Sequence, residues 1–154
     1  MNQDIKSENL MFFAGLNQDI YADNGQFEGL SSGIAEHLEK FDYKLNQEDL
    51  IFSFMKGEEV KTLVLTPENK LYDFVFVPQE KKVNLESVNK IDIIKVDPVF
   101  EQQKQSFGTS EISFSVMSQL KILFSNHDVI DINATQYRGN HELNTLSEAL
   151  MKRI

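Results

Sequence analysis

Residues 50–78 read LIFSFMKGEEVKTLVLTPENKLYDFVFVP and contain short apolar runs separated by polar turns. The runs Leu50–Met55, Val60–Thr66 and Leu71–Val77 are rich in the aromatic and branched side chains that favour strands. The connections are about four residues long, whereas parallel strands need a crossover of a dozen or more. This stretch therefore predicts an antiparallel meander.

The chain after this meander also has the pattern of short strands. Val83–Val88 leads into a predicted strand at Ile91–Val96, and a turn at Asn126–Asp128 leads into another at Val129–Asn133. Residues 99–109 are mostly polar and rich in Gln. We expect a long loop there.

Ile112, Phe114 and Val116 alternate with other side chains, and so do Leu120, Ile122 and Phe124. The second pattern is almost purely of period two, which indicates a strand with one buried face. The alternation predicts strands at Ile112–Met117 and Leu120–Ser125. The region of Ser118 is either a tight turn between two strands or part of one long bent strand. The sequence leaves both alternatives open.

Segments at the two ends of the chain have helical spacing. At the N-terminal end the spacing predicts helices over Ser7–Tyr21 and Ser31–Phe41, with Ser31 or Ser32 as the cap of the second. At the C-terminal end, Leu143–Ile154 carries one apolar stripe, and Asn140 is a candidate cap. The sequence therefore predicts an α+β fold that ends in a helix.

Several stretches resemble the small bacterial members of the pleckstrin-homology-like (PH-like) superfold. Val64–Leu71 resembles their second hairpin, and Val83–Ile91 resembles their V-x-L-x-x-V-x-x-I pattern. Their final hairpin and helix are similar to Leu120–Phe124, Val129–Ile132 and Leu143–Leu150. The resemblance covers about Leu50–Ile154 and implies an antiparallel barrel of about seven strands with a C-terminal capping helix. We expect residues 1–45 to form a helical extension packed on a barrel domain at 46–154.

The charge distribution argues against anionic partners. The chain has a net charge of −9, and residues 1–50 alone carry ten acidic side chains against three lysines. Nucleic acids and anionic membranes attract clustered Lys and Arg. PH-like domains that bind phosphoinositides carry such clusters near the first hairpin, whereas Lys56–Lys61 has two bases and two acids. We interpret the group Lys81, Lys82, Lys90 and Lys95 as a solvated surface.

The first residues of the chain bear on its cellular compartment, and its residue types exclude some kinds of catalysis. Met1–Leu10 has neither the basic start nor the apolar stretch of a signal peptide, so we expect a cytoplasmic protein. The chain has no cysteine, which excludes thiolate nucleophiles and disulfides. The Ser-x-x-Lys pairs at Ser53, Ser87 and Ser118 lie on predicted strands or turns, where this spacing does not bring the two groups together.

Few residues are candidates for catalysis or metal binding. The chain has three histidines, of which His37 falls among apolar positions of a predicted helix. His127, Asp131 and His141 form a site only if the fold brings them together, because metal ligands and proton donors must converge. We predict no catalytic residue, no cofactor and no metal ligand.

Three functions remain open. The leading hypothesis is a non-enzymatic binding or adaptor module for a protein or peptide, which adds as a strand to the edge Ile112–Val116. The first alternative is an acidic inhibitor or immunity-type protein that masks a basic target through residues 1–50. The second alternative is an enzyme with a site around His127, Asp131 and His141. The sequence does not determine the oligomeric state.

Overall fold

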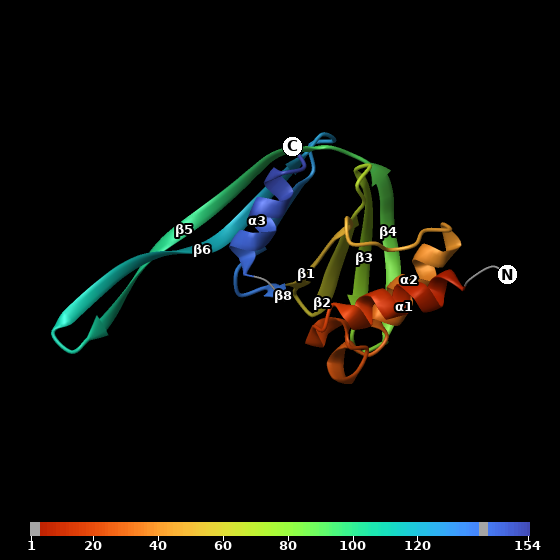
Figure 1. Cartoon of the computed structure of the whole chain (residues 1–154), viewed down its shortest axis with the longest axis horizontal. Helices are drawn as coiled ribbons and strands as arrows, with labels where there is room; N and C mark the ends of the chain where they lie inside the picture. The colour runs from red at the N-terminus through yellow and green to blue at the C-terminus, as the bar shows by residue number, and fades with distance from the viewer. Residues whose placement is uncertain (1–3, 139–141) are drawn as a thin grey trace. The chain divides into compact units, whose positions relative to one another are not determined.

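The structure is a computed structural model that describes residues 4–138 and 142–154, and its fold is α+β (Figure 1). The helices are α1 (Ile5–Gly15), α2 (Leu30–Lys40) and α3 (Leu143–Met151), with short 3-10 helices at Asp19–Tyr21 and Gly25–Phe27. The strands are β1 (Leu50–Lys56), β2 (Glu59–Leu65), β3 (Lys70–Val77), β4 (Lys82–Lys90), β5 (Ile93–Phe107), β6 (Ser110–Phe124), β7 (Val129–Asn133) and β8 (Tyr137–Arg138).

The described residues divide into two compact units. The first contains residues 4–91 and 138, and the second contains 92–137 and 142–154. Both N-terminal helices and strands β1–β4 therefore belong to the first unit, and β5–β7 with α3 belong to the second.

The sheet of the first unit has the order β4-β3-β2-β1-β8, and neighbouring strands among β1–β4 are antiparallel. The hairpin between β1 and β2 closes at the pair Lys56 and Glu59, with Gly57 at a φ of 64°. The next hairpin places Asn69 at a φ of 62°. Gly and Asn accept this left-handed conformation at low cost. The predicted antiparallel meander is confirmed.

Helices α1 and α2 pack with the sheet around the core of the first unit. The core contains Phe13, Ile20, Tyr21, Leu30, Ile34, Leu38, Leu45, Val60, Val64, Tyr72, Phe74, Phe76 and Val83. Helix α2 approaches β4 closely at Gly33, where an added Cβ atom would lie 2.5 Å from Cγ2 of Val83. Only a residue without a side chain fits this helix–strand contact.

A buried chain of hydroxyl groups joins the N-terminal segment to the sheet. Ser53 and Thr62 are cross-strand partners on β1 and β2, and their hydroxyl oxygens are 2.7 Å apart. The hydroxyl of Tyr21 lies 2.7 Å from that of Ser53. Buried hydroxyl groups need such partners, because an unpaired one loses its hydration without compensation.

The ends of the first two helices differ in part from the sequence expectation. Helix α1 ends at Gly15, and a separate 3-10 helix covers the rest of the predicted segment up to Tyr21. The cap of α2 is Gly29 at a φ of 95°, not Ser31 or Ser32. The N–H of Gly29 donates to the carboxylate of Asp23, so a side chain from the preceding turn fixes this helix start.

The second unit pairs its strands in the order β5-β6-β7. Helix α3 contacts β5 and β6 and buries Leu143, Leu146 and Leu150. The buried apolar residues of the three strands are Ile93, Val96, Met117, Leu120, Ile122, Phe124 and Ile132. The C-terminal helix runs from Leu143 to Met151 with Glu142 at its N-cap, so it ends before Ile154, and the candidate cap Asn140 lies outside the described residues.

The structure corrects the expected barrel. In the described residues the strands form separate sheets of five and three strands, with no closed barrel. The chain passes from the first unit to the second between Ile91 and Asp92, and the backbone hydrogen bonds change partner there. The N–H of Ile91 donates to Asn69 O in the first unit. The next N–H, of Asp92, donates to the hydroxyl of Ser125 in the second unit.

The expected long loop at residues 99–109 is also wrong. Strand β5 continues to Phe107 and pairs with β6 along its whole length. Its residues after Val99 are mostly polar because they are exposed to solvent, not because they form a loop. Of the two alternatives at Ser118, the single long strand is correct, with a shift in pairing at that residue. Among the described residues, no helix has the length and apolar character needed to cross a membrane.

Candidate functional site

The most distinctive surface of the second unit is the end of its long hairpin, residues 99–117, which we call the β-arm. Val99 pairs with Gln119, and the pairing continues without a further shift from Phe100–Met117 to Phe107–Ser110. Beyond α3 and β7 the hairpin continues as a two-stranded ribbon (Figure 1). Isolated two-stranded ribbons have little core of their own.

One face of the β-arm carries a row of apolar side chains, mostly on β6. Phe107, Ile112, Phe114 and Val116 lie on this face, because alternate residues point to the same side and the pairing places both strands in register. Phe107 is 53% exposed, Ile112 52% and Phe114 39%. Glu101 is the charged residue on this face of the arm, opposite Val116. Gln103 and Gln105 face Phe114 and Ile112, so this side of the arm is an exposed apolar stripe along β6 with polar residues beside it on β5.

The other face of the β-arm is polar over most of its length. The side-chain amide of Gln102 donates to the hydroxyl of Ser115 at 2.6 Å. Lys104 and Glu111 form an ion pair at 3.6 Å in which both side chains are more than half exposed. The β-arm is thus amphipathic, with hydrogen bonds and charges on one side and aromatic and aliphatic groups on the other.

A β-bulge explains why the apolar stripe is not a continuation of the core. Phe100 pairs with Met117 and Val99 with Gln119, so Ser118 is an extra residue in β6. An extra residue reverses the alternation of the side chains that follow it. Met117, Leu120 and Ile122 therefore share the buried face of the second unit, and the stripe lies on the opposite face.

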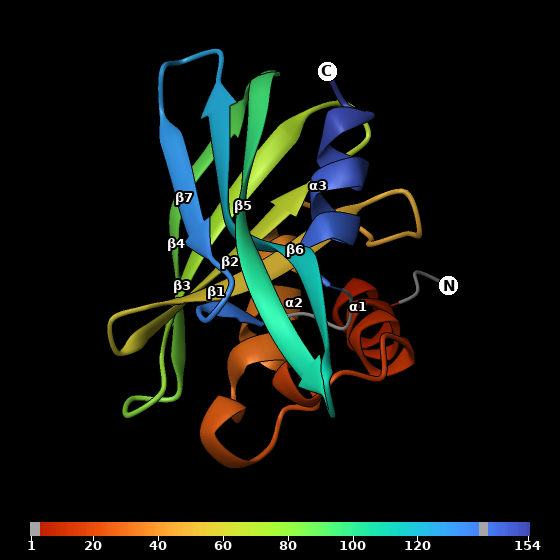
Figure 2. The ribbon, with the colours of Figure 1, turned by 90° about the vertical axis from the view of Figure 1, so that its left-hand side faces the viewer.

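The β-arm also has an exposed strand edge. Strand β7 pairs with β6 from Gln119 to Leu123 (Figure 2). The N–H of Ala134 donates to Ser118 O at 2.9 Å. Across the described ranges 4–138 and 142–154, no strand pairs with this edge over residues 110–117. The edge Ile112–Val116 proposed from the sequence lies within it. Edge groups of this kind can form main-chain hydrogen bonds with another strand.

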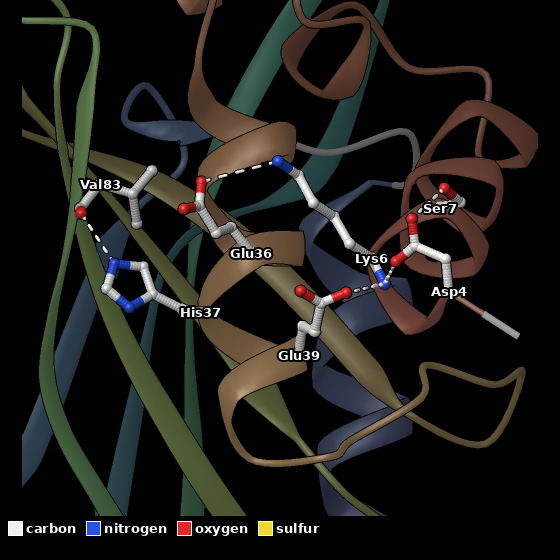
Figure 3. A network of polar contacts seen from close by, with 7 residues as sticks. All are labelled: Asp4, Lys6, Ser7, Glu36, His37, Glu39 and Val83. Atoms are coloured by element: carbon white, nitrogen blue, oxygen red, sulfur yellow. Dashed lines mark hydrogen bonds and ion pairs between the residues drawn. The ribbon is translucent and has the colours of Figure 1, made fainter. Parts of the chain in front are cut away.

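The first unit has a polar recess of about 360 Å³ between α2 and the start of β4. Its lining includes His37, whose Nε2 lies 3.0 Å from Val83 O (Figure 3). This contact and the ring of Phe74, 5.9 Å from the imidazole, hold the histidine between helix and strand. Lys40 and Lys82 also line the recess, as does Glu36. The position of His37 is explained by packing of the helix.

Two of the four lysines grouped from the sequence, Lys81 and Lys95, form ion pairs with carboxylates. Lys81 Nζ lies 2.7 Å from the carboxylate of Glu28, and Lys95 Nζ lies 3.3 Å from that of Asp97. These side chains are mostly exposed. Such pairs contribute little to stability and fit the interpretation of a solvated surface.

The candidate site around His127, Asp131 and His141 falls partly outside the described residues, which exclude His141. His127 lies in the turn between β6 and β7 with a φ of 72°. The carboxylate of Asp131 accepts a hydrogen bond from the side chain of Gln119. Within the described part of the chain, no three His, Asp or Glu side chains gather as a metal site would require.

The acidic N-terminal segment uses several of its carboxylates in local contacts. The hydroxyl of Ser7 donates to Asp4 at 2.8 Å, and this hydrogen bond holds the pKa of Asp4 below its usual value. The N–H of Lys6 donates to Asp4 and to Glu39, which connects the start of α1 to the end of α2 (Figure 3). Glu8 pairs with Lys44 at 3.1 Å. Part of this acidity therefore stabilises the helix pair.

Two tyrosines have a raised pKa for structural reasons. Burial raises the pKa of Tyr43, and the hydrogen bond that its hydroxyl donates to Asp49 adds to this effect. Burial also raises the pKa of Tyr137, which lies in β8. Neither tyrosine lies on the β-arm.

Sequence reasoning found the edge strand of the β-arm but missed its partner. The sequence did contain a signal for the paired strand at residues 99–107. A strand such as 112–116 requires a neighbour, and the polar stretch before it is bounded by the strand-favouring residues Val99 and Phe107. Comparisons with protein-family models, curated proteins and solved structures found no match to this chain. The β-arm thus combines an exposed apolar stripe with an unpaired strand edge.

Proposed function

We propose that the chain is a non-enzymatic binding module that contacts protein through the β-arm. The observation that carries this proposal is the coincidence of the apolar stripe with the exposed edge of β6 over residues 110–117. Main-chain hydrogen bonds along the edge supply affinity, and the alternate apolar side chains supply specificity.

Natural sheets seldom leave such an edge without protection. Charged side chains, prolines and short strands are the usual devices that prevent one edge from pairing with another. The edge strand here has a single charged residue between Ser110 and Met117, namely Glu111, and no proline. Its composition therefore favours pairing over protection.

The same proposal takes the fold as PH-like. Its support is the order of elements, with four antiparallel strands in sequence, then three, then the short strand β8 and the helix α3. The two sheets of the described residues do not close into the barrel that the superfold implies. The PH-like superfold serves binding and scaffolding in many contexts, so the assignment agrees with a binding role and does not by itself identify the partner.

The test is affinity purification of the tagged full chain from its native cell, followed by direct binding measurements with each recovered protein in purified form. The double variant Ile112→Asp/Phe114→Asp places two carboxylates on the apolar stripe. The control Gln102→Asp/Ser106→Asp adds the same charge to the polar face of β5. Circular dichroism establishes that both variants keep the fold.

We expect the stripe variant to lose binding by at least about tenfold, because burying a carboxylate in an apolar contact is costly. The control should bind as the unmodified chain does. Equal binding by all three proteins would overturn the assignment of the β-arm as the contact surface.

A further inference from the structure

We infer that the partner of the β-arm is a second copy of this chain, with the two β6 edges paired antiparallel about a two-fold axis at Phe114. This inference rests on the proposed function of the β-arm and names its partner. A pairing of this kind is isologous, since the same surface serves on both copies.

The sequence around Phe114 is self-complementary for such a pairing. In two identical antiparallel strands centred on Phe114, Ile112 of one copy faces Val116 of the other, and Ser113 faces Ser115. Phe114 faces its own counterpart. Apolar side chains thus meet apolar ones on one face of the ribbon, and hydroxyl groups meet hydroxyl groups on the other.

Two other alignments of the strands match less well. A shift of the axis by half a residue places Ile112 opposite Ser115, which mixes the apolar and polar faces. A parallel, in-register pairing places the two Glu111 side chains beside each other, which like-charge repulsion disfavours. With the axis at Phe114, each Glu111 faces Met117 instead.

The length of the exposed edge matches the length of this pairing. The paired residues are 111–117, and the edge is exposed over residues 110–117 before β7 occupies it. At the other end, the β-arm turns at Gly108, which has a φ of 63°. In this register Gln119, where β7 begins to pair, faces position 109 in the turn of the other copy. Strand β7 of each copy therefore begins just beyond the tip of its partner.

The first experiment measures the mass of the purified full chain by sedimentation equilibrium over a wide range of concentrations. We expect a reversible dimer of twice the chain mass of 17.7 kDa. Ile112→Asp/Phe114→Asp should shift the dissociation constant upward by at least about a hundredfold, because four carboxylates would then lie at the axis. Gln102→Asp/Ser106→Asp, on the strand away from the edge, should leave dimerisation unchanged.

The second experiment tests the register by disulfide trapping, which is clean because the chain has no cysteine. Phe114→Cys should form a covalent dimer on mild oxidation, since the two substituted positions coincide at the axis. A mixture of Ile112→Cys and Val116→Cys chains should form the mixed dimer, whereas either variant alone should not. Disulfides require Cα atoms within about 7 Å, which only the facing positions provide.

The outcomes separate this inference from the proposed function. A chain that is monomeric at every concentration overturns the second copy as partner, whereas loss of other protein contacts in the stripe variant would still support the β-arm as a binding surface. A dimer that survives Ile112→Asp/Phe114→Asp overturns the β-arm as its interface. A dimer in which Phe114→Cys forms no disulfide overturns the two-fold axis at Phe114.

Discussion

The sheet of the first unit and the β-arm of the second contain the same kinds of side chain in opposite surroundings. Phe74 and Phe76 on β3 are fully buried, whereas Phe107 and Phe114 on the β-arm are exposed to solvent. Both regions are antiparallel, but β2 and β3 bury consecutive residues, whereas the β6 strand of the β-arm alternates apolar with polar ones. The phenylalanines of the first sheet are buried because α1 and α2 pack around that core. The apolar pattern of a strand therefore does not by itself determine whether its apolar face is covered.

The largest expected difference between the two regions is the cost of removing a phenylalanine ring. Phe74→Ala should lower the free energy of unfolding by about 3–5 kcal/mol, because it leaves a cavity in the close-packed core. Phe114→Ala removes an exposed ring and should change the unfolding free energy of the monomer by less than about 0.5 kcal/mol. Urea denaturation followed by circular dichroism, at low protein concentration, measures both. A similar loss in both variants would mean that the β-arm is covered in solution.

The second prediction compares a buried with an exposed serine. Ser53→Ala removes the hydroxyl between Tyr21 and Thr62 and should destabilise the chain by about 1–3 kcal/mol. Ser113→Ala on the polar face of the β-arm should have an effect within about 0.5 kcal/mol. Equal effects in the same denaturation experiment would contradict the burial of the hydroxyl chain.

The predictable part of the fold is the part in which local pattern and tertiary environment agree. The strand at Val129–Asn133 has its predicted bounds, and α3 begins where its apolar stripe begins. The strands of the meander agree to within a residue or two, because most of the aromatic and branched side chains that predict them are buried in the sheet.

The parts that sequence reasoning missed depend on contacts far along the chain. Residues 99–107 look like a loop because solvent surrounds the ribbon, and only the pairing with β6 makes them a strand. Gly29 caps α2 through a carboxylate six residues earlier, which no propensity scale describes. The candidate site was predicted only in part. The alternation of Ile112–Val116 predicts a strand, but the bulge at Ser118 determines that its apolar side chains lie on the face opposite the buried core.

The third prediction concerns alkaline pH and the first unit, since the β-arm contains no tyrosine. The raised pKa of Tyr43 means that the folded chain holds this proton more tightly than the unfolded chain does. Burial of the neutral hydroxyl, together with its hydrogen bond to Asp49, therefore stabilises the fold fully below about pH 10, the pKa of an unperturbed tyrosine, and less as the pH rises above it. Tyr43→Phe should cost about 1 kcal/mol at pH 8. Unfolding measured at pH 8 and pH 10.5 should show a smaller alkaline loss in the variant, and an unchanged loss would contradict this assignment.

The smallest expected difference is between the ion pairs of the two regions. Lys61 and Asp73 lie on facing strands of the first sheet with Nζ and Oδ1 2.7 Å apart, and each side chain is about one-fifth exposed. The pair Lys104 and Glu111 on the β-arm is longer and far more exposed. Because solvent screens exposed charges, Asp73→Asn should cost about 1 kcal/mol and Glu111→Gln less than about 0.5 kcal/mol.

Salt sharpens this last comparison. Moderate sodium chloride should remove most of the small effect of Glu111→Gln, because ions screen exposed charges more than mostly buried ones. The effect of Asp73→Asn should persist, because Lys61 would still lose a short charge-assisted hydrogen bond. Urea denaturation of both variants at low and moderate salt provides the measurement. If Glu111→Gln proved the more costly change and resisted salt, the β-arm would be desolvated in solution, as it is when a second copy covers its edge.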